Sequence, residues 1–372
     1  MKFLVVVGAR PQFIKASVFS RAISIHNKRL SKKQITEVIL HTGQHFDSSM
    51  SDSFFKDLSI PTPKYHLGLS NLSHGAMTGR MIEEIEKVLI TEAPDCLIVF
   101  GDTNSTLAAA ISASKLHIPI AHIEAGLRSN NLFMPEEINR ILTDRVSSFL
   151  FCSSEDSINN LKSEGYPLPM YHRKQSIFNC GDVMFDVVKI YKDKSIKQHP
   201  IADFGLTKDK YVLATLHRPN LTDSASNLFN AFEALQEIAK ELKVVIPLHP
   251  RAKLMLRKHN ASSLLKNLVV LDPVSYLQMQ SLISNSKAVI TDSGGLQKES
   301  MWHKKPCLTL REDTEWKETV SLGWNTLVSI NKRLILDAWS KIGIPNSKDI
   351  SVYGHGNAAE LILDELIKIF SK

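Results

Sequence analysis

The chain alternates short apolar runs with amphipathic stretches from one end to the other. The apolar runs are rich in β-branched residues and end in Gly, Asp, Ser or Thr, and the stretches between them have helical spacing. This rhythm is typical of βαβ units, in which helices join parallel strands. We predict the strands of a first parallel sheet at 2–7, 37–41, 96–100, 118–123, 149–152 and 177–180.

The same rhythm restarts after a polar stretch at 191–210. A second set of strands is predicted at 211–215, 244–247, 268–271, 288–291 and 307–310, alternating with helices near 226–241, 275–285 and 295–303. The fold class that follows is α/β, with two Rossmann-like doubly wound parallel sheets.

The last segment, 356–372, has its apolar residues along one helical stripe, and we expect it to pack back on the first domain. The predicted domains are therefore 1–185 joined by the helix at 356–372, and 186–355. Ligands of open parallel sheets bind beyond the carboxyl ends of the strands, so polar residues that follow strands are expected to face an interdomain active-site cleft.

Composition narrows the class of protein. With 372 residues, 43% of them hydrophobic and 22% charged, the chain is an ordinary globular protein long enough for two cores. The opening MKFLVVVGAR has too short an apolar run for a signal peptide, and no other window approaches the roughly 18 uninterrupted apolar residues of a membrane span. We therefore expect a cytoplasmic protein with no membrane partner.

The distribution of charges and cysteines argues against a nucleic-acid-binding protein and against a metal-binding protein. The net charge of +7 comes mainly from scattered lysines without the aromatic interleaving of a nucleic-acid-binding face, although it would help to attract a small anionic substrate. The four cysteines lie far apart with no CxxC pair. We predict buried thiols in a reducing compartment, no metal site and no nucleic-acid partner.

Two motifs near the N-terminus place polar residues after strands. In VVVGARPQFIK (5–15), Arg10 and Lys15 flank a strand-to-helix turn, where a helix N-terminus favours anions, although Pro11 also indicates plain helix initiation. HTGQHFD (41–47) brings two histidines and a glutamine, which either reach a ligand or cap the loop.

Acids follow the next two strands. VFGDTNSTLAAA contains Asp102, which is either a helix cap or an acid/base group at the end of a buried strand. In HIEAGLRSNNLFMPEEINR (122–140), Glu136 and Glu137 also fit a first helical turn, where acids complement the helix dipole. Glu124 directly follows a buried strand and needs a partner, for which His122 or Arg128 is predicted.

The second half repeats this arrangement. His217 with Arg218 and His249 with Arg251 follow its first two strands, which indicates a site that faces an anion.

The strongest single motif is ITDSGGLQKES (290–300). Its Ser293, Gly294 and Gly295 join strand to helix, so that backbone amides and a hydroxyl can hold a diphosphate. Glu299 can accept hydrogen bonds from both ribose hydroxyls. Arg311 and TEWKE (314–318) add polar groups after the next strand.

These motifs, in this order and over nearly the whole chain, resemble the non-hydrolysing UDP-N-acetylglucosamine 2-epimerase family. The motifs are GARPQFIK, HTGQH, GDTNSTLAAA, HIEAGLR, PEEINR, HRP, TDSGGLQKES and YGHGNAAE. The resemblance implies the GT-B architecture, a UDP-sugar substrate held by the second domain, and a homodimer. It also implies inversion at sugar C2 without a cofactor: UDP is eliminated to leave a 2-acetamidoglucal and then added back.

The resemblance further implies roles for individual residues. Asp102, Glu124, Glu136 and His217 match the acid/base and intermediate-stabilising residues of the family. Diphosphate contacts match Arg10, Lys15, His217, Ser293, Gly294 and Gly295; Glu299 matches the ribose contact, and His249 and Arg311 are further expected substrate-binding residues.

Three departures bear on the substrate and on regulation. The spacer between Glu124 and Glu136 is shorter than in the UDP-N-acetylglucosamine enzymes, and TEWKE replaces the commoner TERPE. Both features resemble the branch that acts on UDP-2,3-diacetamido-2,3-dideoxyglucuronate, so two substrates stay open. QHFDSSM (44–50) lacks the second glutamine with which bacterial members bind an allosteric UDP-N-acetylglucosamine, which argues against that regulation.

Two other functions fit part of the pattern. A GT-B glycosyltransferase shares the TDSGG and glutamate site, but transfer does not require the acids at 102, 124 and 136. A UDP-sugar-binding regulator would tolerate Glu124→Gln and Asp102→Asn, whereas an epimerase would lose proton exchange at C2.

Overall fold

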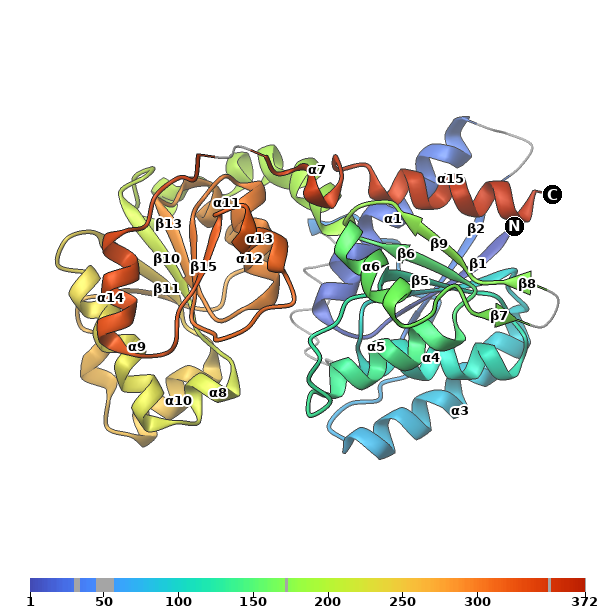
Figure 1. Cartoon of the computed structure of the whole chain (residues 1–372), viewed down its shortest axis with the longest axis horizontal. Coiled ribbons are helices and arrows are strands. Elements are labelled where there is room, and N and C mark those ends of the chain that lie inside the picture. The colour runs from blue at the N-terminus through green and yellow to red at the C-terminus, as the bar shows by residue number, and fades with distance from the viewer. Residues whose placement is uncertain (30–33, 45–56, 171–172, 347–348, 372) are drawn as a thin grey trace. The chain divides into compact units, whose positions relative to one another are not determined.

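The computed structural model describes residues 1–29, 34–44, 57–170, 173–346 and 349–371. The chain divides into two compact units, Met1–Val187 with Ser351–Lys372, and Val188–Ile350. Each unit is a parallel sheet with helices packed against it (Figure 1).

The first unit has a seven-stranded sheet whose neighbouring strands all pair in parallel. Its order is β3 (Tyr65–His66), β2 (Thr36–His41), β1 (Lys2–Val7), β4 (Cys96–Phe100), β5 (Ile120–Ala125), β6 (Phe149–Cys152) and β9 (Ser176–Asn179). A separate antiparallel ribbon joins β7 (Pro169–Met170) to β8 (Arg173–Lys174). The helices are α1 (Arg10–Arg29), α3 (His74–Glu92), α4 (Asn104–Lys115), α5 (Pro135–Val146), α6 (Glu155–Ser163), the start of α7 (Val183–Gln198), and α15 (Ala358–Phe370).

The second unit has a six-stranded parallel sheet. Its order is β12 (Val269–Leu271), β11 (Lys243–Pro247), β10 (Tyr211–Thr215), β13 (Ala288–Thr291), β14 (Cys307–Thr309) and β15 (Asn325–Leu327). The helices are α8 (Pro219–Thr222), α9 (Ala225–Ile238), α10 (Pro250–Lys258), α11 (Tyr276–Asn285), α12 (Gly294–Trp302), α13 (Lys317–Ser321) and α14 (Lys332–Ser340).

Both sheets are buried on their two faces, which explains why their strands read as continuous apolar runs. All five residues from Phe3 to Val7 have no exposed surface, and the same holds from Cys96 to Phe100. These two central strands form the middle of the first core.

The structure confirms the predicted α/β fold class and its two doubly wound sheets. Two short edge strands, β3 and β15, were not predicted. The fifth strand begins at Ile120 rather than at 118, because the amide of Ile118 donates back to Ala113 at the end of α4. No helix in the described ranges is long and apolar enough to cross a membrane.

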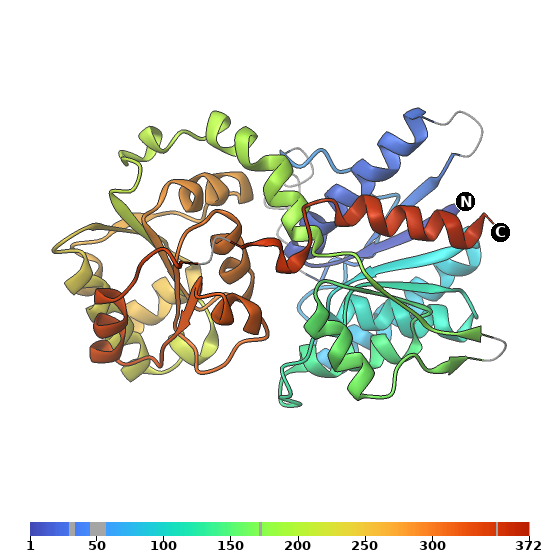
Figure 2. The same ribbon diagram turned by 45° about the horizontal axis from the view of Figure 1, so that its top comes forward.

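The last helix belongs to the first unit, where it packs along α1 (Figure 2). The ring of Phe370 lies 6.3 Å from that of Phe3 and 5.9 Å from that of Phe149, as centroid distances. At its other end, the Asp186 carboxylate accepts hydrogen bonds from the amides of Ala358 and Ala359, at 2.9 and 2.7 Å. The C-terminal segment thereby covers one side of β1.

The order of strands reverses at one place in each sheet, between β1 and β4 and between β10 and β13. At such a switch point the connections leave on opposite faces, and a crevice opens at the carboxyl ends of the two strands. The residues that follow these four strands are therefore the candidates for ligand contact.

Candidate active site

Glu124 lies inside β5 near its end, rather than directly after the strand as predicted, and its side chain reaches the first switch point beside Gly101. Its backbone has φ 74°, in the left-handed region that non-glycine residues rarely adopt, and the pairing of β5 with β6 shifts register there. Its carboxylate lies 2.7 Å from Nζ of Lys15, and the two side chains are only 9% and 10% exposed. Burial alone would lower the pKa of Lys15, but Glu124 raises it above its usual value. The two residues therefore form a buried, charged pair.

The prediction that His122 or Arg128 pairs with Glu124 is wrong. Both bind Asp144, which is completely buried: His122 Nδ1 lies 2.7 Å and Arg128 Nη1 2.8 Å from its carboxylate oxygens. Burial would raise the pKa of Asp144, but His122 and Arg128 hold it below its usual value. A buried carboxylate is tolerated only with such partners. His122 and Arg128 therefore pair with Asp144 rather than with Glu124.

Asp102 follows β4 and lies beside the Lys15–Glu124 pair. A Cβ atom on the intervening Gly101 would be 3.4 Å from Lys15 Nζ and 3.5 Å from a Glu124 carboxylate oxygen. The alternative that Asp102 caps a helix is wrong, because Thr103 is the N-cap residue of α4. The Asp102 carboxylate instead pairs with Arg140.

The two glutamates of PEEINR have different surroundings. Glu137 is buried and accepts hydrogen bonds from the amides of Ser129 and Asn130, at 2.9 and 3.0 Å. Its carboxylate also lies 2.8 Å from Arg140 Nη1. Glu136 is exposed in the first turn of α5. Glu137 therefore fixes the loop before α5, whereas Glu136 presents its carboxylate to solvent.

Arg10 is the first residue of α1 and is partly buried. Two residues earlier, a Cβ on Gly8 would lie 2.1 Å from the Ser105 hydroxyl and 2.2 Å from that of Thr42. The turn after β1 is thus packed directly against the start of α4, which brings the ends of β1 and β4 together.

The structure divides the HTGQHFD motif. His41 is buried between the rings of Phe13 and His66, with centroids 4.8 and 4.3 Å away, so the ligand-contact interpretation is wrong for this residue. The Gln44 side chain accepts hydrogen bonds from the amide and hydroxyl of Ser105, at 3.0 and 2.7 Å, which is the capping alternative. His45 and the rest of QHFDSSM lie outside the described residues.

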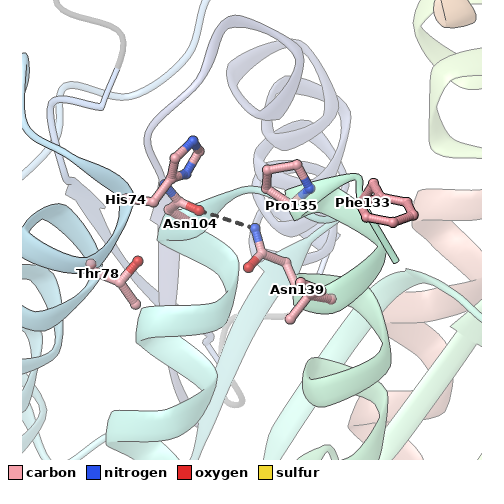
Figure 3. A pocket seen from close by; sticks show the side chains of 8 residues that line it. His74, Thr78, Asn104, Phe133, Pro135 and Asn139 are labelled. Carbon is pink, nitrogen blue, oxygen red and sulfur yellow. Dashed lines mark hydrogen bonds between the residues drawn. The ribbon is translucent and has the colours of Figure 1, made fainter. Parts of the chain in front are cut away.

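A pocket of about 380 Å³ opens between α3, α4 and α5 (Figure 3). The Asn139 amide donates to the Asn104 side chain at 3.1 Å and to the carbonyl of Asp102 at 2.9 Å. Phe133, from the SNNLF spacer, is 99% exposed at its rim. The residues that line this pocket are His74, Gly75, Thr78, Asn104, Phe133, Pro135, Ile138 and Asn139.

In the second unit, Asp292 organises the end of β10. One of its carboxylate oxygens accepts hydrogen bonds from the amides of His217 and Arg218, both at 2.8 Å. The other lies 3.3 Å from Nδ1 of His217. His249 is the N-cap residue of α10, and its ring lies 5.8 Å from that of His217. The two histidines therefore share one edge of the sheet.

The SGG motif forms the predicted strand-to-helix turn. Ser293 is the N-cap residue of α12, and Gly294 and Gly295 are its first two residues. The space that a Cβ of Gly294 would occupy lies 2.6 Å from a carboxylate oxygen of Glu315, which pairs with Arg311 at 3.0 Å. The first helical amides, which have no partner within a helix, lie at this turn.

Glu299 is buried one turn further along α12. Its Oε2 accepts a hydrogen bond from Gln280 at 2.5 Å, and Gln280 Oε1 lies 2.7 Å from the ring nitrogen of His303. Burial lowers the pKa of His303 to about 3, so its ring is neutral near pH 7. The other Glu299 oxygen faces the helix start, 3.8 Å from the Cβ position of Gly295.

Sequence reasoning missed several residues that hold the site in place. Asp292 had a usable signal, because it lies between a strand and the SGG turn. Arg140 lies one turn after Glu137 on α5 and could have been predicted as its partner. Gln280 had no signal, because it is an ordinary polar position of α11. Within the described ranges, no group of three or more His, Cys, Asp or Glu side chains is arranged to hold a metal ion.

Comparison with known proteins shows which family the sequence resembles. The family model for UDP-N-acetylglucosamine 2-epimerase matches residues 28–367. The UDP-2,3-diacetamido-2,3-dideoxy-D-glucuronate 2-epimerase of Pseudomonas aeruginosa is 46% identical over 99% of this chain and 100% of its own.

Two solved structures are similar over the whole chain. The Methanocaldococcus jannaschii UDP-GlcNAc 2-epimerase in complex with UDP-GlcNAc and UDP has a TM-score of 0.86 at 39% identity, covering 99% of this chain and 100% of that one. The Neisseria meningitidis enzyme bound to UDP-GlcNAc has a TM-score of 0.85 at 31% identity, with the same coverage. The chain therefore belongs to the UDP-N-acetylglucosamine 2-epimerase family, a family of isomerases with the GT-B fold.

Proposed function

We propose that this chain interconverts UDP-N-acetylglucosamine and UDP-N-acetylmannosamine by inverting the sugar at C2. The observation that carries the proposal is Glu124, a buried acid with a left-handed backbone beside Asp102 at the first switch point. Backbone strain of this kind persists where the surrounding structure enforces it, often at functional sites.

The reaction has two balanced halves. The anomeric C–O bond breaks first, with oxocarbenium character that makes the C2 proton removable, and a base then takes this proton, which leaves a 2-acetamidoglucal and UDP. The reverse addition re-forms the C–O bond and delivers a proton to the opposite face of C2. Since protons are transferred on both faces of C2, the reaction needs more than one acid/base group or a reorientation of the glucal, and no electrons are gained or lost.

Four residues supply this chemistry in our proposal, namely Asp102, Glu124, Glu136 and His217. The UDP group is held by a second set, which neutralises the diphosphate and binds the ribose through Glu299. That set is Arg10, Lys15, His249, Ser293, Gly294, Gly295, Glu299 and Arg311.

A second substrate, UDP-2,3-diacetamido-2,3-dideoxyglucuronate, is favoured by a specific observation. The relative that is 46% identical is named for that sugar, whereas the UDP-GlcNAc enzymes of the two solved structures are 39% and 31% identical. The short SNNLF spacer and TEWKE point the same way.

The test is an NMR time course in deuterium oxide with each UDP-sugar in turn. A 2-epimerase incorporates deuterium at C2 and produces a second anomeric signal without any acceptor. The sugar that exchanges identifies the substrate, and absence of exchange with both would refute the proposed reaction.

We further propose that the domains are 1–185 with 356–372 and 186–355, and that the protein works in the cytoplasm as a homodimer. The four cysteines are all buried, which fits a reducing compartment. Light scattering of the purified chain tests the homodimer: a mass near twice 41.7 kDa supports it, and a mass near 41.7 kDa contradicts it.

A further inference from the structure

Glu315 lies where the diphosphate-binding turn of the proposed function begins, although neither a strand end nor a helix cap explains it. Its carboxylate is 2.6 Å from the Cβ position of Gly294, and Nη2 of Arg218 is 3.5 Å from that same position. On its other side, Arg311 Nη2 lies 3.0 Å from the carboxylate. The acid is thus placed between two arginines beside the first turn of α12.

The residues directly before and after Glu315 both contact side chains of α12. The Thr314 hydroxyl donates to the Gln297 side chain at 2.7 Å, and Gln297 is completely buried. Nζ of Lys298 lies 3.3 Å from the centre of the Trp316 ring, within the range of a cation–π contact. Glu315 is therefore held against Gly294 by its two neighbours in the sequence.

The neighbouring arginines keep this carboxylate ionised in spite of its burial. Its side chain is 12% exposed, and burial alone would raise the pKa of Glu315. The charges of Arg311 and Arg218 outweigh burial and hold the pKa of Glu315 below its usual value. The negative charge of Glu315 thus offsets part of the positive charge of the two arginines.

Arg311 keeps hydrogen-bonding capacity for a ligand. Its side chain is 10% exposed, and its Nη1 is buried without a hydrogen-bond partner among the described residues. Its second acidic neighbour, Asp313, is 74% exposed and lies 3.3 Å from the same Nη2 that faces Glu315. Nη2 of Arg311 therefore faces the two carboxylates, and Nη1 remains available for another acceptor.

We propose that Glu315 is a positioning residue that orients Arg311 and Arg218 toward the diphosphate of the UDP-sugar, and that position 294 is glycine to admit its carboxylate. This proposal rests on the proposed function. In this proposal, position 294 is not glycine in order to let a phosphate approach the backbone. The space beside its Cα is already filled by a side chain of the protein.

The test compares binding of UDP and of uridine to the full chain by NMR titration. Glu315→Gln and Glu315→Ala should each weaken UDP binding at least tenfold and leave uridine binding unchanged, since uridine has no phosphate. Asp313→Ala, which removes the exposed acid, should change neither. If UDP binds as well or more tightly to the Glu315 variants, the carboxylate does not position the arginines for the diphosphate and the proposal is overturned.

A double mutant tests the reason for the glycine. Gly294→Ala should lower the melting temperature, and adding Glu315→Ala should restore at least half of the loss, because the clashing carboxylate is gone. If the decreases in melting temperature of the two single variants add up in the double variant, this explanation of the glycine is overturned. If the wild-type chain binds no UDP, the proposed function itself is refuted. If the wild-type chain binds UDP but the Glu315 substitutions affect UDP and uridine binding equally, only the present inference is refuted.

Discussion

Glu124 combines two unfavourable features in one residue. A non-glycine residue in the left-handed region costs on the order of 1–3 kcal/mol, and a buried carboxylate needs a partner to be tolerated. The Lys15 ion pair supplies that partner from the first helix of the chain. The identity of this partner could not be read from the sequence, because 109 positions separate the two residues and nothing in their local patterns connects them.

Glu124→Gln should separate binding from chemistry. We expect deuterium exchange at C2 to fall by about 10²- to 10⁴-fold, the usual contribution of a general acid or base, with UDP binding retained. Glu164→Gln is a suitable control, since it removes a partly exposed carboxylate that binds Arg128 instead. Exchange that survives in Glu124→Gln would remove this residue from the proposed mechanism.

Two glycines of the first unit provide a matched pair for packing. Gly8→Ala places a methyl group 2.1 Å from the Ser105 hydroxyl, so we expect a loss of about 1–3 kcal/mol in the free energy of unfolding. Gly79→Ala in α3 meets no atom within 4 Å and should be stabilising by up to about 1 kcal/mol, because alanine favours a helix. Denaturant unfolding measures both, and equal effects would contradict the argument.

At the scale of elements, segments with an apolar run or a clear helical period were predictable, and short segments without either were not. The central strands and the helices α9, α11 and α12 follow from apolar runs and 3.6-residue periodicity. The edge strands β3 (YH) and β15 (NTL) are short and polar in part, so neither forms an apolar run, whereas the equally short β12 (VVL) does. Their place is set by pairing with β2 and β14, which is a tertiary effect.

Site residues were predictable to the extent that they follow central strands. Glu124, Asp102 and the SGG turn all lie at strand ends, where the rule for ligands in parallel sheets places candidate site residues. Asp144 and Gln280 lie within helices rather than at strand ends, and their role depends on what faces them across the fold. His41 fits the strand-end rule as well, but its side chain turns into the core.

The packing of His41 between α1 and β3 predicts a pH-dependent stability. Burial, followed by the neighbouring His66, lowers the pKa of His41 to about 4 from its usual 6.5. The unfolded chain then binds the proton more readily than the folded chain, so stability is complete above pH 6.5 and is lost as the pH falls from 6.5 toward 4. The loss amounts to about 3 kcal/mol for a shift of this size.

His41→Phe keeps a ring in the stack and removes the titrating group. The variant should show a smaller decrease in melting temperature between pH 7 and pH 5 than the wild-type chain. An unchanged decrease would mean that His41 does not contribute to this acid sensitivity.

At the scale of the whole molecule, the first unit is assembled from both ends of the chain. Residues after 350 return to it and place Phe370 against Phe3 and Phe149. Phe370→Ala should cost about 2 kcal/mol, less than a fully buried phenylalanine, because Phe370 is only partly buried. Leu361→Ala, on the same helix but 41% exposed, should have little effect on the melting temperature.

This return of the chain also sets an order of events during synthesis. A ribosome adds residues from the N-terminus, and domains generally fold as units once their segments have emerged. The second unit, Val188–Ile350, emerges complete while the first still lacks α15. The half of the protein that is translated first is therefore the last to be finished, and the apolar surface around Phe3 stays uncovered until translation reaches the final helix.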